Sequence, residues 1–318
     1  MRVLVALLLA LSAQAVRAEG DALSWLTRMH VATQTLSYTG TFVYRSGDQS
    51  ETSRIVHVVG KDGIHERLET LDGHPREIVR NGDEVKCYLP DRMTVKVDKQ
   101  TGTKAFPQLL PENLQDISEH YLIDKGKTEN VAGYDSQAIV LQPKDKLRYG
   151  HKLWADLKTG MLLKSQTIDE TGGTLEQFAF TQISIGGKID PDELKPKLLG
   201  KARVWHIENS DATQTNLAAS GWTIKPDLPG FKKVAELKRT QGGANEVGHV
   251  IFSDGLVALS VFIEPMANKT SLPPAGLSRQ GAISIYSRQL AGHLVTVVGE
   301  TPAESVKSLA ESVEYRKP

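Results

Sequence analysis

The sequence predicts an α+β protein in two units: a large antiparallel sheet curled into a barrel or half-barrel, and a smaller antiparallel sheet packed with a helix. Three observations predict it. About eleven short runs that alternate apolar and polar residues follow a single amphipathic helix. An antiparallel sheet of that size rarely stays flat. The alternation is lost over residues 186–220, and further hairpin patterns with a final helix come after it.

The first 18 residues have the composition of a secretory signal peptide. A charged start precedes the apolar run 3–11, and small residues follow up to Ala18. The run is too short to span a bilayer comfortably. The absence of cysteine from this segment excludes a lipid anchor on a new N-terminal Cys. Cleavage after Ala15 and cleavage after Ala18 both fit, and either leads us to expect export from the cytoplasm.

The large unit is expected over residues 19–208 and begins with a helix over 21–36 that carries an apolar stripe. Short alternating runs follow, separated by Asp-Gly and Asn-Gly pairs. These pairs favour tight hairpins because both central residues tolerate positive φ. The pattern therefore predicts a sheet of hairpins with a helix against one face.

The stretch 148–183 has the clearest pattern and predicts a three-strand antiparallel meander. Period-two alternation gives this meander one apolar face but does not say which residues form it. Two assignments are open: Trp154 with Phe178 and Phe180, or Leu153 with Leu175. We expect the aromatic set to face inward.

A linker is predicted at 209–220, where the sequence is polar and aperiodic, and the small unit at 221–318. Two hairpins are predicted over 249–263 and 282–299, and the closing segment reads as an amphipathic helix. The stretch 266–280 between the hairpins is rich in Pro, Gly and Ser, so we expect an exposed loop there. The linker is the natural hinge between the units.

Composition and motifs argue against catalysis and nucleic-acid binding. Lysine plus arginine and aspartate plus glutamate both number 38, so no overall field favours nucleic acid. No catalytic signature, phosphate loop or cofactor motif is present. His57 and His65 flank a predicted hairpin but lack the further ligands that a metal needs, so we predict surface or rim histidines and no metal. Cys87 is the only cysteine, which excludes an intramolecular disulfide.

Aromatic placement is the feature that points to a binding site. An acyl chain needs a concave apolar wall with few polar anchors, which aromatic side chains on one face of a curled sheet can supply. Ordinary core packing beneath the first helix is the alternative, and the pattern alone favours it. The candidates for the wall of such a cavity are Trp25, Phe42, Tyr44, Trp154, Phe178 and Phe180.

Segments in both predicted units resemble, in the same order, the RseB/MucB family. The segments that carry the resemblance are Gly40-Thr41-Phe42-Val43-Tyr44, Leu71-Asp72-Gly73, Leu153-Trp154, Leu175-Glu176-Gln177-Phe178, Ser253-Asp254-Gly255-Leu256, Ser260-Val261-Phe262-Ile263-Glu264-Pro265 and Val295-Thr296-Val297-Val298-Gly299-Glu300. The resemblance implies an α+β fold with a large domain similar to the lipoprotein carriers LolA and LolB. Such a domain is an unclosed antiparallel β-barrel with helices in its mouth, and a smaller C-terminal antiparallel sheet packed with a helix follows it.

The resemblance also implies a function: a soluble periplasmic regulator of the sigma-E (AlgU) envelope-stress response, neither an enzyme nor a cofactor protein. It would bind the periplasmic domain of a single-span anti-sigma factor and protect it from the site-1 protease. A lipid or lipopolysaccharide fragment bound by the large domain would loosen that grip, and a homo-oligomer is left open. The candidates for contact with the anti-sigma factor are Asp254, Phe262, Glu264 and Arg288.

A second function fits the pattern of the large unit alone. A periplasmic lipid or lipoprotein carrier of LolA/LolB type would use the same curled sheet. Such a carrier would not need the small unit, so the presence of that unit favours the regulator.

Overall fold

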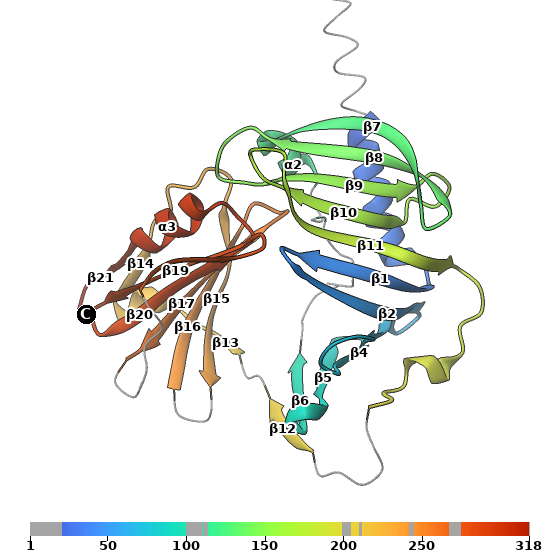
Figure 1. Ribbon diagram of the computed structural model, residues 1–318. Coiled ribbons are helices and arrows are strands. Elements are labelled where there is room, and N and C mark those ends of the chain that lie inside the picture. Colours follow the sequence, from blue (N-terminus) through green and yellow to red (C-terminus); the bar gives the residue numbers. More distant parts are fainter. Residues whose placement is uncertain are drawn as a thin grey trace, which may run out of the picture.

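The computed structural model describes residues 21–99, 110, 114–198, 205–209, 212–241, 245–266 and 275–317. Within them the chain forms a large sheet, a small sheet and a two-stranded ribbon (Figure 1). The predicted α+β architecture with an unclosed large sheet and a smaller sheet-and-helix unit is confirmed. The predicted signal peptide, 1–18, lies outside the described residues.

The large sheet runs in the order β12-β6-β5-β4-β3-β2-β1-β11-β10-β9-β8-β7. Its neighbours are antiparallel except that β12 runs parallel to β6. The pairing of β1 with β11 joins the first and last predicted runs, whereas β7 and β12 remain edges. Its strands are β1 (Tyr38–Ser46), β2 (Gln49–Gly60), β3 (Gly63–Thr70), β4 (Glu77–Asn81), β5 (Glu84–Leu89), β6 (Thr94–Lys99), β7 (Tyr121–Val131), β8 (Tyr134–Pro143), β9 (Gly150–Asp156), β10 (Leu162–Ile168), β11 (Thr174–Ile185) and β12 (His206–Asn209).

The first helix, whose described part is 21–35, packs on one face of β7 to β10, which we call the inner face. Leu26 and Met29 of this helix belong to one buried cluster with Leu153 of β9, and Ile117 of the short helix α2 (Gln115–His120) joins it. Full burial of a side chain of this size contributes about 1.5–3 kcal/mol. The amphipathic stripe of the first helix is therefore what holds it against the sheet.

The predicted meander is β9-β10-β11, but its inward residues are neither of the two predicted sets. Leu153 pairs with Ser165, and Ser165 pairs with Phe178, so Leu153 and Phe178 share the inner face. Trp154 pairs with Lys164 and lies on the opposite, outer face. The expectation that Trp154 faces inward with Phe178 is wrong. Strand register decides which residues of neighbouring strands share a face, and the alternation within a single strand does not determine that register.

The small unit contains a sheet in the order β13-β15-β16-β17-β20-β19-β18 and a ribbon of β14 with β21. Helix α3 (Ala303–Glu311) covers one face of the sheet, as Figure 1 shows, and buries Val306 and Leu309 against Val261 and Val297. The strands are β13 (Ala212–Gln214), β14 (Trp222–Ile224), β15 (Lys232–Gln241), β16 (Asn245–Ser253), β17 (Ala258–Pro265), β18 (Gly276–Gln280), β19 (Ile283–Leu290), β20 (His293–Gly299) and β21 (Val313–Tyr315).

Two segments predicted as irregular contain structure. The predicted loop 266–280 ends in the edge strand β18, while its residues 267–274 lie outside the described residues. The predicted linker 209–220 contains β13 and the 3-10 helix η3 (Leu217–Ser220), and β13 pairs with β15 of the small sheet. Only residues 210 and 211 separate β12 from β13, so the passage between the sheets is short.

After β11, residues 186–198 cross the outer face of β2 and β3 as a strap that includes η2 (Pro191–Leu194). The carboxylate of Glu77, which is fully buried, accepts hydrogen bonds from the amides of Lys197 at 2.9 Å and Leu198 at 3.1 Å. Arg67 binds the same carboxylate at 2.9 Å. The strap is thus fastened to the large sheet by a buried charge.

Candidate functional site: a cavity in the large sheet and buried contacts between the units

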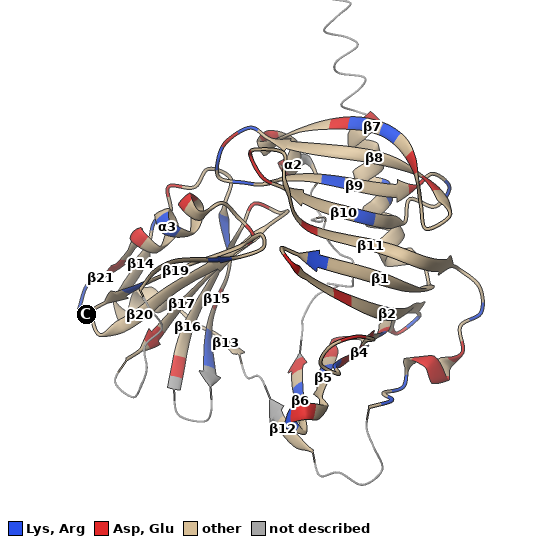
Figure 2. Cartoon of the chain, viewed as in Figure 1, with Lys and Arg blue, Asp and Glu red and all other residues tan. Residues whose placement is uncertain are grey.

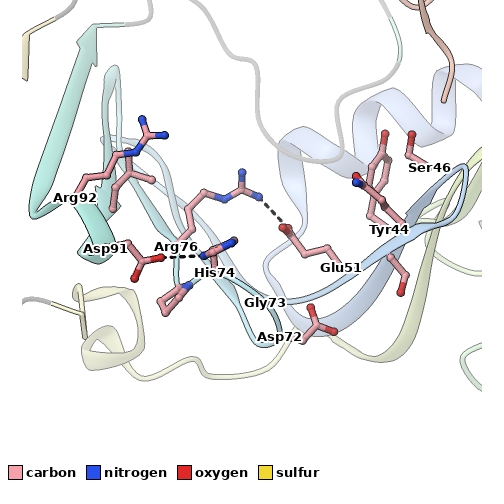
Figure 3. A pocket seen from close by; sticks show the side chains of 13 residues that line it. Tyr44, Ser46, Glu51, Asp72, Gly73, His74, Arg76, Asp91 and Arg92 are labelled. Carbon is pink, nitrogen blue, oxygen red and sulfur yellow. Dashed lines mark hydrogen bonds and ion pairs between the residues drawn. The ribbon is translucent and has the colours of Figure 1, made fainter. Parts of the chain in front are cut away.

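A cavity of about 1080 Å³ opens where the β1–β2 hairpin faces the β3–β4 connection and the 3-10 helix η1 (Pro90–Arg92) (Figure 3). Its volume slightly exceeds the usual range of about 300–1,000 Å³ for small-molecule sites. Tyr44 and Glu51 pair across β1 and β2 and both point to the inner face, so the cavity continues the surface that the first helix covers elsewhere. The lining residues are Tyr44, Ser46, Gln49, Ser50, Glu51, Asp72, Gly73, His74, Pro75, Arg76, Leu89, Asp91 and Arg92.

The charges in the cavity wall are largely paired. The Arg76 guanidinium lies 2.8 Å from the Glu51 carboxylate, and His74 Nδ1 lies 3.0 Å from the Asp91 carboxylate; Figure 3 shows both pairs. Arg92 adds another cationic side chain to this wall. Exposed pairs of this kind are weak and can exchange partners, so the rim suits a guest with an anionic or sugar-like head. The apolar part of the wall comes from Tyr44, Pro75 and Leu89.

Three of the predicted aromatic candidates pack on one another. The ring centroid of Phe42 lies 4.8 Å from that of Phe178 and 5.9 Å from that of Phe180, and all three side chains are buried. Offset and edge-to-face contacts at these distances are favourable for aromatic rings. These three residues therefore belong to the packed core between the helix-covered part of the sheet and the cavity, and they do not line the cavity.

The other three aromatic candidates lie apart from one another. Tyr44 lines the cavity and is 38% exposed. Trp25 is buried in the first helix, with the Arg28 guanidinium 4.0 Å from its ring centroid. Trp154 is buried on the outer face, where the amino groups of Lys152 and Lys164 lie 4.4 and 4.3 Å from its ring. Of the six candidates, only Tyr44 touches this cavity.

A polar layer crosses the inner face between β2, β3 and β4. His57 Nδ1 lies 2.8 Å from the Glu66 carboxylate, which Arg80 approaches at 3.2 Å, and Tyr38 stacks on the imidazole at 4.7 Å. His57 is fully buried, so the prediction of a rim histidine is wrong for it, and His65 lies on the opposite face. The signal was present in the sequence, because His57 stands within an uninterrupted apolar run.

The two units are joined by a buried ion pair that sequence reasoning missed. Arg148, between β8 and β9, reaches Asp254 in the β16–β17 turn with Nε 2.6 Å from Oδ2, and both side chains are at most 1% exposed. The same guanidinium bonds the Asp145 carboxylate and the Pro229 carbonyl oxygen and lies 4.8 Å from the Phe231 ring centroid. Buried charges need such complete pairing to be tolerated. Arg148 thus fixes the small unit against the large one.

The four predicted anti-sigma contact residues differ in where they lie on the small unit and in what they contact. Asp254 is committed to Arg148, and the Arg288 guanidinium donates to the carbonyl oxygens of Ala310 at 2.8 Å and Val313 at the end of α3. Phe262 and Glu264 lie on the sheet face opposite α3, where Phe262 stacks on His249 with centroids 4.3 Å apart. Only this second pair lies on a face that α3 leaves uncovered.

Charged residues of both signs are interspersed over both units (Figure 2). Among the described residues, no group of three or more His, Cys, Asp or Glu side chains could hold a metal ion. No helix in the described part of the chain is long and apolar enough to cross a membrane. The fold and these contacts define a two-unit binding protein, in which a curled sheet with a cavity is locked to a small sheet-and-helix unit.

Comparisons with known proteins agree with this class. The model of the MucB/RseB N-terminal domain matches residues 21–198, and that of the MucB/RseB C-terminal domain matches residues 216–314. The chain belongs to the MucB/RseB family. The sigma factor AlgU regulatory protein MucB of Pseudomonas aeruginosa is 32% identical over 300 residues, which covers 92% of this chain and 90% of that protein. The sigma-E factor regulatory protein RseB of Haemophilus influenzae is 27% identical over 320 residues, covering 98% and 97%.

Solved structures show the same two-unit arrangement. The MucB chain in the Pseudomonas aeruginosa MucA/MucB complex is 28% identical, with a TM-score of 0.73 over 94% of this chain and 100% of that chain. In a crystal structure of MucB in complex with MucA(peri), identity and coverage are the same and the TM-score is 0.70. Both relatives are named as sigma-factor regulatory proteins, and both of these structures hold MucB together with MucA.

Proposed function

We propose that this chain is a periplasmic negative regulator of an extracytoplasmic-function sigma factor, and not an enzyme. It binds the periplasmic segment of a single-span anti-sigma factor and shields that segment from regulated proteolysis. The observation that carries the proposal is the family match, which runs through both units and includes MucB in complex with MucA. The signal peptide predicted over residues 1–18 agrees with a periplasmic location.

The large unit then senses an amphiphile such as a lipid or a lipopolysaccharide fragment. Its cavity of about 1080 Å³ combines paired charges with an apolar wall, which suits a guest with a polar head and an acyl chain. A guest can release the anti-sigma factor only if the two bind different states of the protein with different affinities. In this proposal the face of the small sheet with Phe262 and Glu264 supplies part of the anti-sigma contact.

The test uses the mature chain, an anti-sigma periplasmic peptide and the site-1 protease. We expect the chain to bind the peptide and slow its cleavage, and added lipopolysaccharide to reverse both effects. A Phe262→Ala variant should bind the peptide more weakly, while Leu277→Ala, at an exposed side chain of the edge strand β18, serves as the matched control. Peptide that is cleaved equally fast with and without the chain contradicts the proposal.

The cavity also supports the second candidate, a periplasmic lipid or lipoprotein carrier. A carrier moves a fluorescent lipid between donor and acceptor vesicles and needs no anti-sigma factor. Transfer by a chain that does not bind the peptide favours the carrier, whereas peptide binding without transfer favours the regulator.

A further inference from the structure

A second contact between the units lies directly beside the cavity. The turn from β18 to β19, residues 280–282, sits against the β1–β2 hairpin and the start of β11. The Gln280 side chain donates to Oε1 of Gln49, the first residue of β2, at 3.3 Å. The backbone of Gly281 approaches so closely that a Cβ there would collide with the Ser46 hydroxyl, and its φ of 59° also favours glycine. The turn is therefore closely packed onto the cavity-bearing hairpin.

One carboxylate links this turn to the cavity wall. Glu176 Oε1 accepts a hydrogen bond from the Ala282 amide of the small unit at 3.1 Å and another from the Ser46 hydroxyl at 3.0 Å. Tyr44 lies beside Ser46 in the same wall; burial, and then the Glu176 carboxylate, raise the pKa of Tyr44. Glu176 is 6% exposed. Tyr44 and Ser46 both line the cavity, so Glu176 has the cavity wall on one side and the small unit on the other.

We propose that Glu176 is a relay: a guest that displaces Tyr44 and Ser46 from the cavity wall loosens the bond between Glu176 and Ala282, and so undocks the β18–β19 turn. A nearly buried carboxylate depends on its donors, because each hydrogen bond to a charged group contributes about 1.5–3 kcal/mol. When the cavity-side donors turn away, the carboxylate must seek water or other donors. The inference rests on the proposed function only for the nature of the guest.

The relay is reciprocal by thermodynamic necessity. If the guest weakens the docked turn, then the docked turn must weaken binding of the guest by the same factor. Arg148 and Asp254 form another contact between the units and are not part of this relay. The relay therefore loosens one side of the interface while the buried ion pair still holds the other, which predicts a tilt of the small unit rather than its release.

The first experiment needs no guest. Hydrogen exchange at the Ala282 amide is measured in the full chain, in a Tyr44→Phe/Ser46→Ala double variant, and in His74→Ala as a cavity-wall control that contacts Asp91 instead. The double variant should exchange about tenfold faster at Ala282, as expected from the loss of one charge-assisted bond. The control and the core amides of β17 should be unchanged. Equal Ala282 exchange in the double variant and the wild type overturns the relay.

The second experiment adds a guest, monomeric lysophosphatidylglycerol, an anionic single-chain amphiphile. Bound probe should speed exchange at Ala282 in the wild type. A Glu176→Ala variant should exchange fast from the start, bind the probe at least as tightly and show no further response. A chain that does not bind the probe, or binds it without a change at Ala282, overturns the relay. Binding of the anti-sigma peptide, measured without probe in the same samples, tests the proposed function separately.

Discussion

Removal of the Arg148 guanidinium should destabilise the protein more than loss of any single exposed charge. In Arg148→Met the aliphatic bulk stays, but the Asp254 carboxylate is left in the interface at 1% exposure without its cation. Breaking a buried pair by removing one partner costs about 3–5 kcal/mol, because the remaining charge is uncompensated. That is a large share of a typical unfolding free energy of about 5–15 kcal/mol.

Substitution of the partner residue, Asp254, separates the effect of its negative charge from the effect of its hydrogen bonds within the turn. Asp254 Oδ1 accepts the amides of Leu256 at 3.0 Å and Val257 at 2.9 Å, while Oδ2 receives Arg148. Asp254→Asn keeps one oxygen for the turn and removes the charge. We expect it to cost about 1–3 kcal/mol. In the Asp254→Asn background, Arg148→Met should cost about 2 kcal/mol less than alone, because no buried charge is then stranded.

Urea unfolding followed by tryptophan fluorescence measures all four proteins of this double-mutant cycle. Arg54→Met is the matched control, since Arg54 pairs with Glu193 at side-chain exposures of 44% and 33% and should change stability by at most about 1 kcal/mol. If Arg148→Met costs no more than Arg54→Met, or if the coupling energy is zero within error, then the buried pair does not hold the units together.

Three further predictions concern other polar side chains. Burial lowers the pKa of His151 to about 4 from 6.5, against the opposing effect of Asp254. As the pH falls, the unfolded chain therefore takes up the proton on His151 before the folded chain does, and about 3 kcal/mol of stability present above pH 6.5 is lost by pH 4. Urea unfolding of His151→Gln at several pH values should lack this loss. An equal loss of stability with pH in the variant and the wild type would contradict the prediction. Arg288→Met removes donors from the end of α3 and should lower the unfolding free energy by about 1–3 kcal/mol with unchanged anti-sigma peptide affinity; a selective loss of affinity would instead make Arg288 a contact residue. Glu77→Gln should speed amide exchange at Lys197 about tenfold, and unchanged exchange would mean that other contacts hold the strap.

Local pattern was sufficient for most elements of the large sheet. The alternating residues 84–89 form β5 and the alternating residues 134–143 form β8, because alternation and turn residues are properties of neighbouring positions. Edge strands were missed. β12 and β13 have four and three residues, and β18 lies in a stretch rich in Pro, Gly and Ser, so none carries enough periodicity to be distinguished from a loop.

The candidate site was predictable only in part. Tyr44 was named from the sequence and does line the cavity, yet the charged residues around it come from three separate connections that no local pattern relates. Phe178 was expected to share its face with Trp154, and register separated them. Asp254 was chosen as an exposed contact residue, whereas it is buried beneath Arg148, which is 106 positions away in the chain.

By itself, the sequence determined the fold class, most strands of the large unit, the presence of a second, smaller sheet-and-helix unit and the family, because each depends on local periodicity or on motifs read in order. Tertiary structure alone decided which side chains meet. The cavity, the Arg148–Asp254 pair and the carboxylate of Glu176 shared between units all join residues distant in sequence. Their proximity follows from strand register and from the docking of one unit on the other, and both are properties of the whole packed chain.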